Sequence, residues 1–318
     1  MWLPLLVVLS LIFIYRWYRQ SQILEDLSDK YVFITGCDTG FGNLLAKQLD
    51  SQGMNVLAAC LTEKGAQNLK KEASGRLQTV ILDVTDSQSV NSAAKWVSTI
   101  VKEKGGLWGL VNNAGIGIPG GTNEWLSKDD FLKVINVNLL GAVDVTLHFL
   151  PLIRKARGRI VNVSSVAGRI SICGGGYCIS KYGIESFSDS LRNEMRPFGV
   201  KVCIIEPGFF STQITNTELQ KENIKRCWEK TSEEVRQAYG EEYFRNVCSS
   251  VDMIGPLCTT KLSRVTNCIK HALTAVHPWT RYSAGWDAKF ILVPLSYLPT
   301  AVLDFILIMG QPKPAQGI

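Results

Sequence analysis

The chain has 318 residues, of which 46% are hydrophobic and 19% are charged, and its formal net charge is +6. A composition this rich in apolar residues supplies a large core and excludes an intrinsically disordered protein. The positive charge is spread along the sequence, which argues against nucleic acid as a partner. The nine cysteines show neither CxxC spacing nor clustering with histidine, so we interpret them as mostly free thiols and expect no metal site.

Residues 1–20 begin with an uncharged run, MWLPLLVVLSLIFIY, and Arg16 and Arg19 follow it with Trp17 and Tyr18 between them. An apolar run flanked by aromatic and basic residues is typical of a membrane anchor, and no small-residue cleavage site marks a signal peptide. A buried core helix is the alternative interpretation. For an anchor, the positive-inside rule predicts that the following domain lies on the cytosolic face.

From Lys30 onward, short β-rich runs alternate with longer helical stretches. Continuous apolar strands between helices predict a parallel sheet covered on both faces, the doubly wound, Rossmann-type α/β fold. We expect this domain to span residues 28–285. The expected strands are YVFITG, NVLAAC, LQTVILDV, LWGLVNNAG, GRIVNVSS and VKVCIIEPG, and the expected helices lie near residues 41–52, 63–73, 87–104, 127–152 and 177–197.

Two further segments complete the expected organisation. Residues 212–270 are more polar and helical, and we expect them to form a cap over a cleft. From Phe290 to Met309 the chain is again strongly apolar, but Pro294 and Pro299 interrupt the run. Prolines argue against one continuous membrane span, so we expect the tail, residues 286–318, to pack against the domain or lie at the membrane surface.

The first strand leads into TGCDTGFGN, in which Gly36, Gly40 and Gly42 have the spacing G-x-x-x-G-x-G before a helix. Glycines at a strand-to-helix turn let the backbone approach a dinucleotide pyrophosphate, which the helix N-terminus attracts. By itself this motif is compatible with an ordinary glycine-rich turn. Asp83 at the end of VILDV and the NNAG sequence at residues 112–115 favour the dinucleotide site.

The YCISK sequence contains the residues best suited to chemistry, Tyr177 and Lys181. Four residues apart on a helix, the two side chains project from one face, so the lysine ammonium can favour the tyrosine phenolate. A phenol with a pKa of about 10 needs such help to act as a base near neutral pH. A chance surface pair is the alternative, but Ser164 and Ser165 end the preceding strand, at the sheet edge where α/β proteins bind ligands.

Together these motifs resemble the classical short-chain dehydrogenase/reductase family. The resemblance covers residues 30–212 through TGCDTGFG, NNAG, VNVNLLG, SSVAG, YCISK and EPG. Nearly the whole chain is similar to the microsomal retinol dehydrogenases and related 3α/17β-hydroxysteroid dehydrogenases, for example at DKYVFITGCD, KARGRIVNVSS and RYSAGWDAKF. This resemblance implies an enzyme of the endoplasmic reticulum membrane that moves a hydride between a nicotinamide cofactor and an apolar alcohol, retinol or a 3α- or 17β-hydroxysteroid. Membrane lipid is the other expected partner, and a homodimer is compatible with the resemblance.

The resemblance also implies a role for each site residue. Tyr177 is expected to transfer the proton, Lys181 to tune Tyr177 and bind the nicotinamide ribose, and Ser165 to hydrogen-bond the substrate oxygen. Ser164 has the more usual spacing from Tyr177, whereas Ser165 has the better strand-end context and is our choice. Asn138 in VNVNLLG is expected to hold a water that links Lys181 to solvent. The predicted cofactor-binding residues are Gly36, Asp38, Gly40, Phe41, Gly42, Asp83, Val84, Asn112, Ala114, Gly115, Tyr177, Lys181, Pro207 and Gly208.

We expect NAD in preference to NADP, because no cation stands where it would face a 2′-phosphate. Thr39 occupies the place beside the second glycine, and Cys60-Leu61-Thr62 occupies the end of the second strand. The acidic residue that often holds the ribose hydroxyls of NAD is also missing from that strand end. Lys64 follows closely enough to swing toward a 2′-phosphate.

Two rival hypotheses for the function are a catalytically idle dinucleotide-binding scaffold and a membrane-surface interaction protein built around the apolar ends.

Overall fold

A computed structural model describes residues 2–309 and 311–317, and it contains one parallel sheet of seven strands in the order β3-β2-β1-β4-β5-β6-β7. Neighbours β1 and β4 are separated by two strands in the sequence, so the strand order reverses between them. This reversal is the switch point at which doubly wound sheets bind dinucleotides, and it confirms the predicted Rossmann-type fold. The strands are β1 (Tyr31–Ile34), β2 (Asn55–Cys60), β3 (Gln78–Ile81), β4 (Gly109–Asn112), β5 (Arg159–Val163), β6 (Lys201–Pro207) and β7 (Arg281–Ala284).

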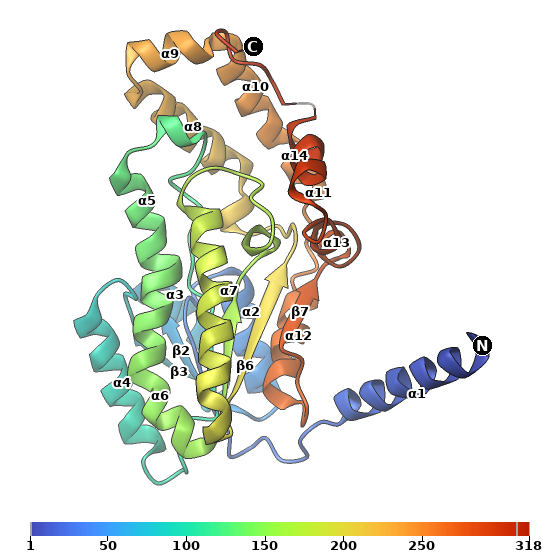
Figure 1. Ribbon diagram of the computed structural model, residues 1–318. Helices are drawn as coiled ribbons and strands as arrows, with labels where there is room; N and C mark the ends of the chain where they lie inside the picture. The colour runs from blue at the N-terminus through green and yellow to red at the C-terminus, as the bar shows by residue number, and fades with distance from the viewer. Residues whose placement is uncertain (1, 310, 318) are drawn as a thin grey trace.

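Helices cover both faces of the sheet (Figure 1). Successive strand residues point to opposite faces, so Val32 and Ile34 enter one apolar core while Phe33 enters the other, and none of the three has exposed surface. Because both faces of the sheet are covered by apolar cores, the strand sequences are continuous hydrophobic runs. The first core includes α2 (Gly40–Ser51), α3 (Glu63–Lys71) and α12 (Ser263–Thr274), and the second includes α4 (Ser87–Val101), α6 (Ala142–Ala156) and α7 (Gly176–Met195).

One long helical segment, Lys128–Ala156, is apolar enough to cross a membrane by length and composition. It joins α5 (Lys128–Ile135) to α6 through a π-helical turn, Asn136–Gly141. Its inward side chains Val145 and Phe149 have no exposed surface, because they pack against the sheet. This segment is therefore a core helix of the domain.

A helical cap stands at one end of the sheet, at the top of Figure 1. Trp125 and Trp228, whose ring centroids lie 4.8 Å apart, are at the centre of its own small apolar cluster. Within the predicted cap region 212–270, α12 packs against the sheet instead, since Val265 and Ile269 are fully buried in the main core. The cap helices are α8 (Thr217–Lys230), α9 (Glu233–Tyr239), α10 (Glu241–Asp252) and α11 (Ile254–Leu257).

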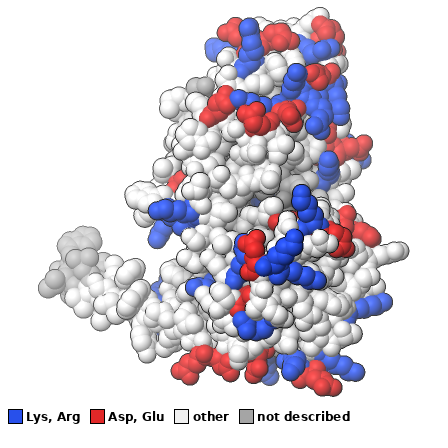
Figure 2. All heavy atoms as spheres, turned by 180° about the vertical axis from the view of Figure 1, so that it is seen from behind, with Lys and Arg blue, Asp and Glu red and all other residues white. Residues whose placement is uncertain are grey.

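The N-terminal helix α1 (Trp2–Ser21) projects away from the domain (Figure 1). Its 20 residues span about 30 Å, which matches the hydrocarbon core of a bilayer. The apolar side chains from Val7 to Tyr15 are 50–73% exposed, and Figure 2 shows no charge on them. Contacts at the base of the helix join it to the domain: Nε2 of His271 lies 2.8 Å from the Gln20 carbonyl oxygen, and a guanidinium nitrogen of Arg19 lies 3.1 Å from Nδ1 of His277. Helix α1 is thus compatible with a membrane anchor, and it is not a core helix.

The C-terminal tail folds into short helices on the side of the molecule from which α1 projects (Figure 1). Its two halves, Ala288–Leu295 and Thr300–Ile308, meet at an angle of 119°. Pro299 immediately precedes the second half, α14, and limits how far either helix can extend. Phe305 and Ile308 are more than 60% exposed. The prolines thus break the tail as predicted, and its apolar side chains face outward.

Candidate active site

The turn between β1 and α2 forms a glycine cradle at the switch point of the sheet. Gly36 and Gly40 have φ angles of +70° and +65°, which favour glycine. A Cβ on Gly36 would lie 2.8 Å from Cα of Ala114, and a Cβ on Gly42 would lie 2.4 Å from the Gly36 carbonyl oxygen. These glycines therefore let β1, β4 and the start of α2 approach closely, as a bound pyrophosphate requires.

A cavity of about 430 Å³ opens above this turn. It lies at the carboxyl ends of the strands and beside the N-terminus of α2, so its position and size fit a dinucleotide. Gly42 lies beneath the cavity and does not line it. The predicted residues that line it are Gly36, Asp38, Gly40, Phe41, Asp83, Val84, Ala114 and Gly115.

The two asparagines of NNAG have different positions. The Asn112 amide donates to Oγ1 of Thr146 and to Oδ1 of Asn162, both at 2.8 Å, so its side chain is buried inside the domain. Asn113 lines the cavity instead, and its Nδ2 donates to the Gly36 carbonyl at 3.1 Å. Neighbouring residues of an extended chain point in opposite directions, so Asn113 lines the cavity and the predicted Asn112 side chain does not.

Asp38 reaches from the glycine turn to the end of β2. One carboxylate oxygen accepts from the Leu61 N–H at 2.8 Å, and the other accepts from the Thr62 N–H at 3.0 Å and the Thr62 hydroxyl at 2.7 Å. An acidic group thus stands at this strand end, although the strand itself supplies none. The sequence prediction missed this placement because Asp38 precedes Leu61 by 23 positions.

A second cavity of about 70 Å³ adjoins the first, since Phe41, Asn113 and Thr212 line both. It contains the hydroxyl, phenol and ammonium groups that the sequence singled out, together with the loop after β6. The predicted residues that line it are Phe41, Gly115, Ser165, Tyr177, Lys181, Pro207 and Gly208, with Ser164 also present.

Tyr177 and Lys181 lie one turn apart near the start of α7. Nζ of Lys181 is 5.7 Å from the Tyr177 ring centroid and donates to the Val163 carbonyl at 2.9 Å. Desolvation lowers the pKa of Lys181 to about 8, and Glu185 opposes this change. Desolvation also raises the pKa of Tyr177 to about 12, against a hydrogen bond from Ser165. Burial therefore outweighs the effect of Ser165, and the pKa of the phenol lies above its ordinary value.

The two serines after β5 point in different directions. The Ser165 hydroxyl lines the small cavity together with Tyr177, lowers the Tyr177 pKa, and donates to the Pro207 carbonyl at 3.5 Å. The Ser164 hydroxyl donates to the Lys181 carbonyl at 3.3 Å, so α7 engages it. This geometry favours Ser165 as the group that meets a substrate oxygen.

Asn138 lies in the π-helical turn and is 2% exposed. Its Nδ2 donates to the Ile116 carbonyl at 2.9 Å and to Oγ of Ser180 at 3.1 Å, while its Oδ1 accepts from the Ile116 N–H at 2.8 Å. The side chain thus fastens the segment after β4 to α7. Its role in holding a water stays a prediction.

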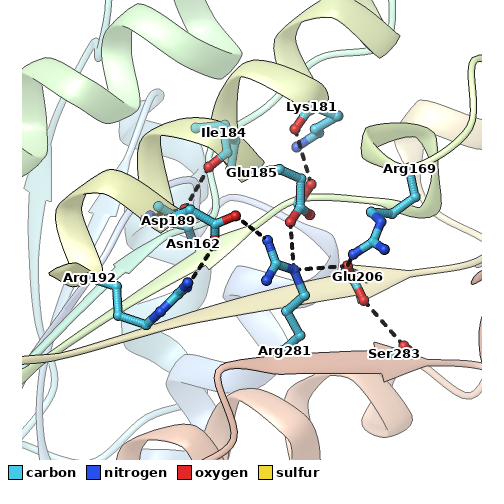
Figure 3. Close-up of polar contacts among 12 residues, drawn as sticks. Asn162, Arg169, Lys181, Ile184, Glu185, Asp189, Arg192, Glu206, Arg281 and Ser283 are labelled. Atoms are coloured by element: carbon cyan, nitrogen blue, oxygen red, sulfur yellow. Dashed lines mark hydrogen bonds and ion pairs between the residues drawn. The ribbon is translucent and has the colours of Figure 1, made fainter.

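A network of ion pairs joins α7 to β6 and β7 (Figure 3). Arg281, on β7, lies 3.1 Å from Glu185 and 2.7 Å from Asp189 on α7, and 3.6 Å from Glu206 on β6. Glu206 also pairs with Arg169 at 3.3 Å. Burial raises the pKa of Glu185 above its ordinary value, while Arg281 opposes the rise. The sequence prediction did not include this network, because β7 follows α7 by many residues and its charges have no local pattern.

A family model described as short chain dehydrogenase matches residues 30–223. The chain belongs to the short chain dehydrogenase family. It is 56% identical over 318 residues to human retinol dehydrogenase 16 and to rat retinol dehydrogenase 7. It is 54% identical over 319 residues to human 17-beta-hydroxysteroid dehydrogenase type 6, and each alignment covers 100% of both chains.

Solved structures show the same fold. A short-chain dehydrogenase from Streptomyces avermitilis has a TM-score of 0.67 and 24% identity, with coverage of 87% of this chain and 93% of the other. A metagenomic short-chain oxidoreductase in complex with NADP has a TM-score of 0.52 and 28% identity, with coverage of 57% and 83%. As a short chain dehydrogenase, this protein is an oxidoreductase that uses a nicotinamide dinucleotide, and the glycine cradle fits that group.

Proposed function

We propose that this short chain dehydrogenase interconverts an apolar alcohol and its carbonyl product, with retinol or a 3α- or 17β-hydroxysteroid as substrate. The observation that carries the proposal is the meeting of Ser165, Tyr177 and Lys181 in one small cavity that adjoins the dinucleotide cavity. Relatives of full length that are named retinol dehydrogenases and a 17-beta-hydroxysteroid dehydrogenase support this substrate class.

The side chains divide the chemistry among them. When bound, the nicotinamide supplies the acceptor or the donor of the hydride. The Ser165 hydroxyl binds the substrate oxygen and holds it near the Tyr177 phenol, which takes the proton during oxidation and returns it during reduction. The Lys181 ammonium stabilises the phenolate form, and its position in the small cavity also suits it to the nicotinamide ribose.

We propose NAD as the preferred cofactor because of the position of Asp38. Its carboxylate lies at the end of β2 and lines the large cavity, so a 2′-phosphate bound there would face a negative charge. The hydroxyls of an NAD ribose would instead find a hydrogen-bond acceptor. Lys64, the nearest candidate for a 2′-phosphate partner, is exposed at the start of α3.

The ratio of kcat/KM for NAD⁺ and NADP⁺ tests this preference in the wild type, Asp38→Asn and Lys64→Ala. We expect a wild-type preference for NAD⁺, a shift toward NADP⁺ in Asp38→Asn and little change in Lys64→Ala. A wild-type preference for NADP⁺ that Lys64→Ala reverses would show that the NAD assignment is wrong.

We further propose that α1 anchors the enzyme in the endoplasmic reticulum membrane with the catalytic domain, residues 28–285, on the cytosolic face. The exposed apolar surface of α1 and of the tail supports the anchor, and Arg16 and Arg19 after the apolar run support the orientation. Protease treatment of intact microsomes should digest the catalytic domain. Full protection that only detergent removes would contradict the orientation.

Initial rates measured side by side test the substrate class, with all-trans-retinol, a cis-retinol, a 3α-hydroxysteroid and a 17β-hydroxysteroid as substrates. We expect NAD⁺ reduction with at least one of them and none in Tyr177→Phe. Binding of the dinucleotide without turnover of any apolar alcohol would favour the idle scaffold.

A further inference from the structure

Two cysteines lie on either side of Tyr177 in the sequence and meet in space. Cys173 is exposed in the loop before α7, and Cys178 is buried in the first turn of α7. Their sulfur atoms are 3.4 Å apart. A disulfide bond is about 2.05 Å long, so an approach of about 1.4 Å would join them.

The segment between the two cysteines consists of Gly174, Gly175 and Gly176, and Gly175 has a φ angle of +85°, which favours glycine. The segment is closely packed, because a Cβ on Gly176 would lie 2.8 Å from the Phe131 carbonyl oxygen. Cys173 is an exposed residue, so the pair lies near the protein surface.

The contact between the thiols favours a thiolate on Cys178. The Cys173 thiol lowers the pKa of Cys178, and the main-chain N–H groups of Cys173 and Ile172 also lower it, although burial opposes them. The same contact raises the pKa of Cys173, so Cys178 is the nucleophile of the pair. The thiolate is the nucleophilic form of cysteine.

We propose that Cys173 and Cys178 form a dithiol site that a hydroperoxide oxidises to a disulfide, and that this disulfide lowers turnover at Tyr177. The Cys178 thiolate attacks one peroxide oxygen, the O–O bond breaks, and a sulfenic acid forms as hydroxide leaves. Cys173 then attacks the Cys178 sulfur, the S–O bond breaks, and the second oxygen leaves as water. For hydrogen peroxide, two thiols lose two protons and two electrons in all, and two waters form.

The position of Tyr177 links the new bond to catalysis. Cys178 follows Tyr177 directly in the first turn of α7, so a pull on Cys178 moves the phenol relative to Ser165. The loop has little freedom on its other side, where the Gly175 N–H donates to Oδ1 of Asn123 at 2.8 Å. A displacement of about 1 Å at a reacting group can cost on the order of a hundredfold in rate. We therefore expect oxidation to reduce kcat by at least about tenfold.

The test uses the full-length protein in detergent, treated with hydrogen peroxide that catalase then removes. The initial rate with retinol and NAD⁺ should fall by at least about tenfold and return after dithiothreitol. Mass spectrometry of peptides should show Cys173 linked to Cys178, with a mass lower by two hydrogens. Cys173→Ser should escape the reversible loss, whereas Cys248→Ser, in the cap, should behave as wild type.

The inference would be overturned by absence of the Cys173–Cys178 peptide, by an equal loss of rate in Cys173→Ser, or by a linked peptide without any change of rate. The activity readout rests on the proposed function, but the peptide readout does not. If the reduced wild type turned over no apolar alcohol, the proposed function would fail, and absence of the linked peptide would separately refute the dithiol site.

Discussion

Replacement of Arg281 by methionine should destabilise the fold by about 3 kcal/mol. Arg281 is 29% exposed and faces two buried carboxylates, Glu185 and Glu206, at 3.1 and 3.6 Å. Removing one partner of a buried ion pair costs about 3–5 kcal/mol. Glu206 keeps Arg169 at 3.3 Å, and the pair with Asp189 is exposed enough to contribute less than about 1 kcal/mol. Loss of the partner of Glu185 therefore dominates, near the lower end of that range.

The destabilisation should depend on pH. Burial already raises the pKa of Glu185, and removal of Arg281 removes a group that lowers it. For a carboxyl group whose pKa is higher in the folded than in the unfolded state, stability is greatest below the unfolded pKa and is lost as pH rises through the folded pKa. The difference between wild type and Arg281→Met should therefore be larger near pH 8 than near pH 5.

Thermal unfolding of the detergent-solubilised protein, followed by circular dichroism, measures this effect. We expect the midpoint of Arg281→Met to fall by on the order of 5 °C. Glu185→Gln combined with Arg281→Met should recover part of the loss, because a neutral amide needs no cation, and Arg281→Lys is the matched control that keeps the charge. A midpoint within 1 °C of wild type, or an equal loss at both pH values, would refute the reasoning.

Three further predictions concern catalysis and the membrane. Tyr177→Phe should remove nearly all turnover and leave dinucleotide binding intact, because the ring stays while the proton-transfer group is lost. Steady-state kinetics and NADH fluorescence measure the two effects. Activity within a few-fold of wild type would contradict this prediction. The affinity for NADH should fall as pH rises through about 8, because Lys181 loses its charge there. In Lys181→Arg the affinity should depend less on pH. An unchanged slope in this variant would exclude Lys181 as the origin of the pH dependence. Deletion of residues 1–20 should weaken flotation of the protein with liposomes without abolishing it, because the apolar tail can still bind the membrane interface. A fully soluble product would show that the tail does not bind the membrane.

The sequence alone predicted the features that depend on local periodicity. Continuous apolar runs such as YVFITG and GRIVNVSS became central strands because a residue buried on either face of a sheet must be apolar. The spacing of Tyr177 and Lys181 placed them one turn apart, since an α-helix repeats every 3.6 residues. Pro294 and Pro299 correctly indicated a broken tail, because proline interrupts helical hydrogen bonding.

Only the tertiary structure decided which side chains meet across the fold. Asp38 supplies the carboxylate at the end of β2, and Arg281 supports α7 from β7, although no local pattern connects them with those places. The pKa of Tyr177 is also a tertiary property, because the burial that raises it comes from the surrounding protein. Helical and strand periods act over a few residues, whereas burial and charge act through space, and the sequence does not display those distances.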